Sequence, residues 1–88
     1  MTNQRLEYTL YDIIAEIQDM KRYGKVHPDY ATIHEIHNSL KPEYGDNLEM
    51  MKPQILEALR NLYRAKIITS YNNVNGVLMF NIINPLNR

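Results

Sequence analysis

The sequence contains no cysteine and no tryptophan, and its 88 residues include only three glycines and four prolines. The lack of cysteine excludes a disulfide framework, a thiolate zinc site and a cysteine nucleophile. No apolar run approaches the ~18 residues of a membrane span, and the N-terminus lacks the apolar core of a signal peptide. We therefore expect a cytoplasmic protein with no membrane partner.

Groups of residues with catalytic or metal-binding spacing are also scarce. No Ser-His-Asp set, glycine-rich phosphate loop or pair of inward carboxylates stands out. His34 and His37 are three residues apart, whereas the zinc-protease helix needs histidines four apart with Glu after the first. They could share a metal with His27 or an acid, but a surface His34 and a partly buried His37 explain them more simply. We predict no enzyme, no metal, no cofactor and no small-molecule ligand.

The charge is balanced overall but not along the chain. Ten basic and ten acidic side chains give a net charge of zero, which argues against a nucleic-acid coat protein. Residues 1–46 hold five basic and eight acidic side chains, a net charge of −3, and residues 47–88 hold five and two, a net charge of +3. This polarity either reflects chance clustering of solvated charges or provides one phosphate-facing side.

Apolar spacing predicts two helices in the first half of a single domain spanning residues 1–88. Residues 1–8 read as a polar arm, and Thr9 caps a helix over residues 9–23, which could start nearer Leu6. Thr32 and Glu35 form a capping box for a second helix, which Pro42 should end. Residues 41–52 then read as a long connection. The inward positions are Leu10, Ile13, Ile14, Ile17 and Met20 in the first helix, and Ile33, Ile36, His37 and Leu40 in the second.

A third helix is predicted over residues 53–66, with Pro53 at its first position. Its apolar side carries Ile55, Ala58, Leu59, Leu62 and Ala65. Leu56 and Tyr63 lie together on one flank, which we assign to the core, although a second apolar contact surface would fit the same spacing.

The chain then turns through a β-hairpin closed by Asn75-Gly76. A two-residue type I′ turn would pair Val74 with Val77 and Tyr71 with Phe80. The predicted core face holds Ile67, Thr69, Tyr71, Leu78, Phe80 and Ile82, and the opposite face holds Ser70, Asn72, Met79 and Asn81. The fold class is therefore mainly α with a small β-hairpin, an α+β domain.

The segment ILEALRNLYRAKII resembles the recognition helix of winged-helix regulators of the MarR and ArsR type, and ATIHEI resembles the capped start of their second helix. The resemblance covers residues 9–83 and implies a winged helix-turn-helix with three helices and a C-terminal two-stranded wing. The chain departs from the family pattern at Lys66, where glycine is usual, and in its long connection before Pro53. The wing tip also lacks Lys and Arg.

The resemblance implies a transcriptional regulator that reads the major groove of double-stranded DNA with helix 53–66. Carried over by position, the DNA-contacting residues are Lys52, Gln54, Glu57, Arg60, Asn61 and Arg64. With so few cations a monomer should bind weakly, so we expect a homodimer. Tyr8, Tyr11 and Tyr23 are its candidate interface, although they could simply rim the core. The neutral charge and uncharged wing also fit an alternative, a winged-helix adaptor that binds protein and not DNA.

Overall fold

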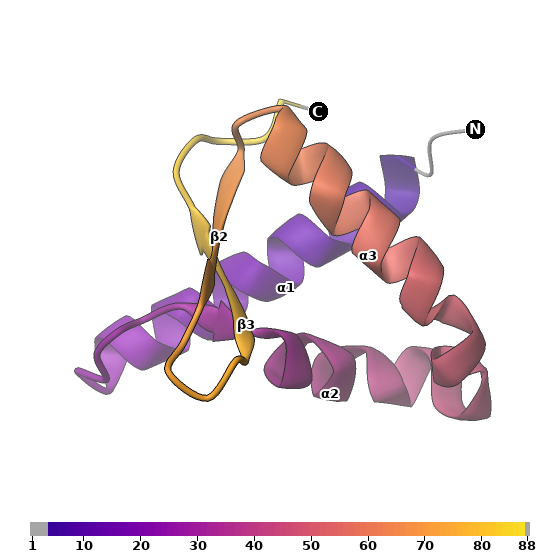
Figure 1. Cartoon of the computed structure of the whole chain (residues 1–88), viewed down its shortest axis with the longest axis horizontal. Helices are drawn as coiled ribbons and strands as arrows, with labels where there is room; N and C mark the ends of the chain where they lie inside the picture. Colours follow the sequence, from indigo (N-terminus) through magenta and orange to yellow (C-terminus); the bar gives the residue numbers. More distant parts are fainter. Residues whose placement is uncertain (1–3, 88) are drawn as a thin grey trace.

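A computed structural model describes residues 4–87 as a mainly helical domain with a small antiparallel sheet, which confirms the α+β class (Figure 1). The elements are α1 (Gln4–Tyr23), β1 (Ala31–Thr32), α2 (Ile33–Tyr44), the 3₁₀ turn η1 (Gly45–Asn47), α3 (Leu48–Arg64), β2 (Ile68–Asn72) and β3 (Leu78–Ile82). The strand order is β1–β3–β2. The predicted two-stranded hairpin is therefore incomplete, because Ala31 and Thr32 pair with Phe80 and Met79 as a third strand.

Helix α1 starts at Gln4, five residues before the predicted Thr9 and close to the alternative start near Leu6. Residues 4–8, predicted to belong to a polar arm, are helical, and the rest of that arm, residues 1–3, lies outside the described residues. Leu6 continues the stripe of Leu10 and Ile14 and is only 2% exposed, so core packing accounts for the extra turn. Thr9 does not cap the helix, because it lies inside it and its hydroxyl donates to the Arg5 carbonyl at 2.9 Å.

The capping box of α2 is confirmed, and it is tied to α1. The Glu35 amide donates to Thr32 Oγ1 at 3.2 Å, and the Thr32 amide donates to Glu35 Oε1 at 2.9 Å. Lys21 of α1 donates to the same carboxylate at 2.6 Å and to the Tyr30 carbonyl at 2.7 Å. Partial burial raises the pKa of Glu35, but the hydrogen bonds from Lys21 and Thr32 outweigh it and hold the pKa below its usual value.

The sequence predicted that Pro42 ends the second helix and that Pro53 begins the third, and both predictions are wrong. Pro42 lies in the last turn of α2, which continues to Tyr44, and Pro53 lies inside α3, which starts at Leu48. The expected long connection is therefore only the three residues of η1. Each internal proline forfeits a backbone hydrogen bond. Burial of Leu48 and packing of Met51 against the core favour the longer helix despite that loss.

Helices α1 and α3 end in the same backbone motif, with a lysine in the left-handed conformation. At the end of α3 the Lys66 amide donates to the Tyr63 carbonyl and the Ile67 amide donates to the Leu62 carbonyl, both at 3.0 Å. These two bonds define a Schellman motif, in which the left-handed residue is usually glycine. Here that residue is Lys66, with φ of 62°, and Lys25 has φ of 56° after α1. The missing glycine therefore leaves the helix end intact.

We expect Lys66→Gly to raise the free energy of unfolding by about 0.5 kcal/mol. Relief of left-handed strain, roughly 1–2 kcal/mol, exceeds the extra unfolded-state entropy of glycine, roughly 0.5–1 kcal/mol. Thermal unfolding should show a melting temperature about 2–4 °C higher. Lys66→Ala is the control, because it removes the charge but keeps Cβ, and it should give no gain. A Lys66→Gly variant less stable than Lys66→Ala would contradict the left-handed assignment.

The hairpin register differs from the predicted one by one residue on β2. The pairs are Ser70 with Phe80 and Tyr71 with Met79. The predicted type I′ turn with paired Val74 and Val77 is therefore wrong. Instead the Asn73 amide donates to the Val77 carbonyl at 3.0 Å, which leaves a three-residue loop in which Gly76 alone has a positive φ, 76°. The Asn73 side chain stabilises this loop by accepting from the Asn75 amide at 2.8 Å and the Val77 amide at 3.0 Å.

The observed register places the side chains of β2 on the opposite faces of the sheet from those predicted. A slip of one residue moves every side chain of a strand to the opposite face. Ser70 and Asn72 now share a face with Leu78 and Phe80, and Tyr71 lies on the other face. There its ring stacks on Tyr30, with ring centroids 5.1 Å apart. The core itself contains Leu6, Leu10, Ile14, Ala31, Ile36, Leu40, Leu48, Ile55, Ala58, Leu59, Leu62, Ile68 and Phe80.

Candidate nucleic-acid interface

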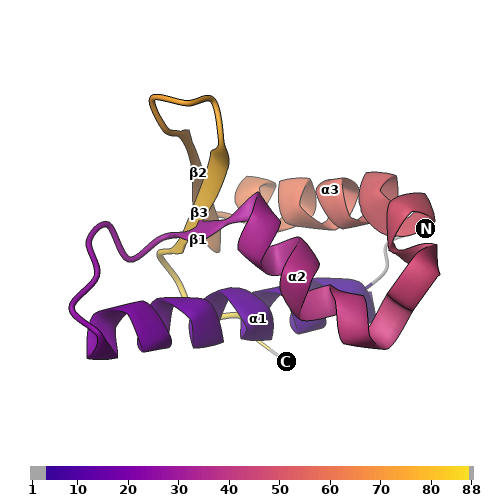
Figure 2. The same ribbon diagram turned by 90° about the horizontal axis from the view of Figure 1, so that it is seen from below.

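The charge imbalance of the sequence has a partial counterpart in space. In Figure 2, α1 lies at one side of the molecule, and α3 and the hairpin tip lie at the other. The middle of α1 carries Asp12, Glu16 and Asp19. Helix α3 carries Arg60 and Arg64, both exposed. The acidic middle of α1 thus lies on the opposite side of the molecule from α3, although α1 as a whole also carries Arg5, Lys21 and Arg22.

Arg60 and Arg64 flank one acid on the exposed side of α3. An Arg60 nitrogen lies 3.6 Å from Glu57 Oε2, and an Arg64 nitrogen lies 4.0 Å from Glu57 Oε1. All three side chains are more than half exposed. Surface pairs of this kind contribute roughly 0–1 kcal/mol. Both guanidinium groups therefore remain available to an anionic partner, although Glu57 reduces the local positive potential.

The other predicted contact residues are spread around the helix. Gln54 is exposed. Lys52 donates to Glu49 at 2.7 Å. Asn61 is half-buried and donates to Glu7 of α1 at 3.2 Å. The prediction that Asn61 belongs to the exposed face is therefore wrong, because packing of α1 against α3 directs its side chain to the α1 side.

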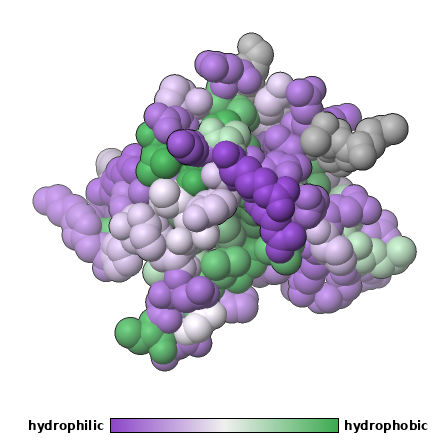
Figure 3. Space-filling view, turned by 45° about the horizontal axis from the view of Figure 1, so that its top comes forward, coloured by the Kyte–Doolittle hydropathy of each residue, from purple (hydrophilic) through white to green (hydrophobic). Residues whose placement is uncertain are grey.

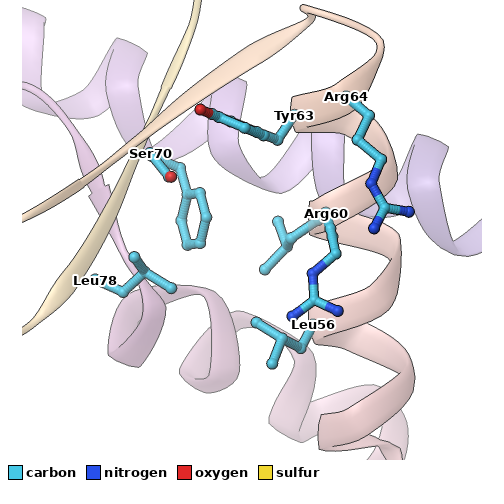
Figure 4. Close-up of a pocket in the computed structure, with 8 residues that line it drawn as sticks. Leu56, Arg60, Tyr63, Arg64, Ser70 and Leu78 are labelled. Atoms are coloured by element: carbon cyan, nitrogen blue, oxygen red, sulfur yellow. The ribbon is translucent and has the colours of Figure 1, made fainter.

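A hollow lies between α3 and the hairpin, and it was not predicted. Leu56 and Tyr63 are 42% and 51% exposed, so their assignment to the core is wrong and the alternative of a second apolar surface holds. The hollow has a volume of about 470 Å³. Figure 4 shows Tyr63 directed toward Ser70, with Arg60 along the helix side. The lining residues are Leu56, Leu59, Arg60, Tyr63, Arg64, Ser70, Leu78 and Phe80.

The hollow exists because of the hairpin register. In the predicted register Tyr71 would face α3, whereas the structure places the small Ser70 there, opposite Phe80. The available signal was Asn73, whose side chain favours the three-residue loop over a two-residue turn. Figure 3 shows apolar patches interrupting a largely hydrophilic surface.

The hairpin adds no charge to this face. Residues 68–82 contain no Lys, Arg, Asp or Glu. At its tip Val74 is fully exposed, and the Asn73 side chain is already used within the loop. Any electrostatic attraction of an anionic ligand must therefore come from outside the hairpin.

The three tyrosines proposed for a dimer interface do not form one patch. Tyr8 and Tyr11 are half-buried, and Tyr23 is almost fully exposed at the end of α1. Tyr8 and Tyr23 are fifteen residues apart on one helix, which corresponds to about 22 Å. The helix surface between them carries acidic residues. The homodimer remains a prediction.

Residues 4–87 contain no group of three or more His, Cys, Asp or Glu side chains placed to hold a metal ion. Burial and the nearby charge of Lys52 lower the pKa of His37, which favours its neutral form. No helix in the described part of the chain has the length and apolar character needed to cross a membrane. Comparison with protein-family models, curated proteins and solved structures finds no match to the chain.

Proposed function

We propose that this protein is a winged-helix domain that binds double-stranded DNA with α3 in the major groove and acts as a transcriptional regulator. The observation that carries the proposal is the pair of exposed arginines one turn apart on α3, Arg60 and Arg64. The order α1–β1–α2–α3–β2–β3, with β3 between the other strands, supports it. That is the order expected of a winged helix-turn-helix, with β2 and β3 as the wing.

In this proposal two side chains contact bases and two contact phosphates. Arg60 can donate two hydrogen bonds to guanine, and Gln54 can pair with adenine. Arg64 and Lys52 neutralise phosphates, which position the helix without reading sequence. Because the wing is uncharged, only a few counterions are released, so affinity and its salt dependence should be modest. A dimer reading two half-sites would supply the remaining affinity.

The Arg60→Ala/Arg64→Ala variant should lose at least about tenfold in affinity for duplex DNA, because two cationic contacts disappear. Fluorescence anisotropy with a labelled random duplex, at low and moderate salt, measures this. The matched control is Arg5→Ala/Lys41→Ala, which makes the same charge change on the exposed surfaces of α1 and α2. Equal loss in both variants, or no binding of the wild type at low salt, would contradict the proposal.

A second candidate function is a winged-helix module that binds protein and not DNA. The specific observation in its favour is the exposed apolar pair Leu56 and Tyr63 beside an uncharged hairpin. A DNA-binding face has no evident use for an apolar hollow, because DNA offers few apolar groups beyond the thymine methyl.

A further inference from the structure

The hollow between α3 and the hairpin has the character of a binding site for one large apolar side chain. Its volume of about 470 Å³ falls within the range typical of ligand pockets. Leu56 and Tyr63 form the helix side, and Leu78 and Phe80 form the sheet side. An apolar group entering it would remove the exposed surfaces of Leu56 and Tyr63 from water, which is favourable.

One border of the hollow is an open sheet edge. Within residues 4–87, β3 is the only strand that pairs with β2. Two hydrogen bonds mark the ends of the β2–β3 ladder. The Asn73 amide donates to the Val77 carbonyl, and the Ile83 amide donates to the Ile67 carbonyl. Along two antiparallel strands, residue pairs that are hydrogen-bonded to each other alternate with pairs whose backbone groups point away from the partner strand. The backbone N–H and C=O groups of Ser70 therefore point away from β3, and residues 70–72 are exposed.

The helix side of the hollow also carries positive charge. Arg60 and Arg64 line the hollow, and each is more than half exposed despite its loose contact with Glu57. Guanidinium groups pair with carboxylates through two parallel hydrogen bonds. A ligand with an acidic group next to its apolar group would complement this wall.

We infer that an extended segment of a partner protein adds to β2 as a further strand, places one large apolar side chain in the hollow and directs flanking carboxylates to Arg60 and Arg64. This inference does not rest on DNA binding. An added strand forms main-chain hydrogen bonds at an open edge and sends alternate side chains to one face. Because Ser70 shares its face with Phe80, those side chains reach the hollow. A segment bound there occupies the same arginines that would contact DNA, so the two ligands exclude each other.

The first test uses synthetic peptides on the whole chain. The probe is a fluorescein-labelled octapeptide with a central Phe flanked by Asp and Glu. We expect it to bind, and we expect at least about tenfold weaker binding when the Phe becomes Ala or when the acids become Lys. Equal binding of all three peptides would overturn the inference.

The second test uses variants of the protein. Leu56→Glu should weaken binding of the acidic peptide at least about tenfold, because it places a like charge in an apolar site. The matched control is Met50→Glu on the same helix, at a residue 78% exposed and outside the hollow. It should bind as the wild type does. Circular dichroism would confirm that both variants fold, and equal loss in both would overturn the inference.

The third test addresses the sheet edge. Ser70→Pro removes an outward N–H and leaves the β2–β3 ladder bonds in place, because proline is tolerated on edge strands. Binding should weaken about 2–10-fold, the effect of one hydrogen bond, and Ser70→Ala should bind normally. Equal affinity of Ser70→Pro and Ser70→Ala would overturn the strand-addition mode.

NMR separates the two classes of ligand. Methyl signals of Leu56 and Leu78 should respond to the acidic peptide. If they respond to duplex DNA and to none of the peptides, the hollow belongs to a DNA interface and the inference is overturned. Peptide binding without any DNA binding would support the inference while refuting the DNA proposal.

Discussion

Replacing Leu6 with alanine is expected to lower the free energy of unfolding by about 2–5 kcal/mol, the usual cost of truncating a fully buried leucine. Leu6 is 2% exposed and belongs to the single core cluster. A domain of this size has roughly 5–10 kcal/mol of stability in total. The variant should therefore unfold at a much lower urea concentration, with an unchanged dependence on urea.

The control for Leu6→Ala is Val74→Ala, which truncates a fully exposed apolar residue and should change the free energy of unfolding by less than about 0.5 kcal/mol. The comparison tests where the fold begins. If Leu6→Ala cost as little as Val74→Ala, residues 4–8 would be a solvated arm and not the first turns of α1.

Gln18→Leu should destabilise the protein by about 2–3 kcal/mol. Gln18 is 1% exposed, and it joins α1 to β3. Its amide nitrogen donates to Asn81 Oδ1 at 2.8 Å, and its carbonyl accepts from the Ile82 amide at 3.0 Å. Leucine keeps most of the volume but leaves these two groups without their partner, and each such loss costs about 1–3 kcal/mol. Urea denaturation measures the effect.

A double-mutant cycle with Asn81→Ala isolates the side-chain contribution. Residues that share a hydrogen bond are non-additive, so the double variant should be more stable than the sum of the single effects predicts. Amide exchange at Ile82 should also accelerate in Gln18→Leu. Full additivity would show that the bond between Gln18 and Asn81 is not stabilising, and a Gln18→Leu variant as stable as the wild type would show the same for both bonds from Gln18 to β3.

Helix faces could be predicted from the sequence because apolar spacing records them directly. Ile36 and Leu40 are buried as expected, as are Leu59 and Leu62. The capping box of Thr32 and Glu35 is also local, and it was predicted correctly. The ends of the helices were harder to predict. Pro42 and Pro53 indicate helix breaks, but burial of residues elsewhere in the chain favours continuing the helices through them. Met20 shows the limit of spacing alone, since it continues the apolar stripe of α1 yet is mostly exposed.

For the candidate site, the sequence predicted the exposure of a side chain correctly only where that exposure depends on the residue's position around its own helix. Arg60, Arg64 and Gln54 are exposed on α3, as the helical wheel implies. Asn61 could not be placed, because its bond to Glu7 depends on how α1 crosses α3. The hollow could not be foreseen either. It depends on a one-residue register that the Asn73 side chain selects.

The short strand β1 has a consequence for self-association. β1 covers one side of β3 with only two residues, so its own outer edge is too short for extensive pairing. In the described chain β2 is therefore the one strand with an open edge long enough to pair with another strand along the full length of β2. Two molecules joined edge to edge through β2 would form a closed pair related by a two-fold axis, in which both usable edges are consumed. Growth of fibres needs a second free edge on each molecule. Association through β2 would therefore stop at a pair.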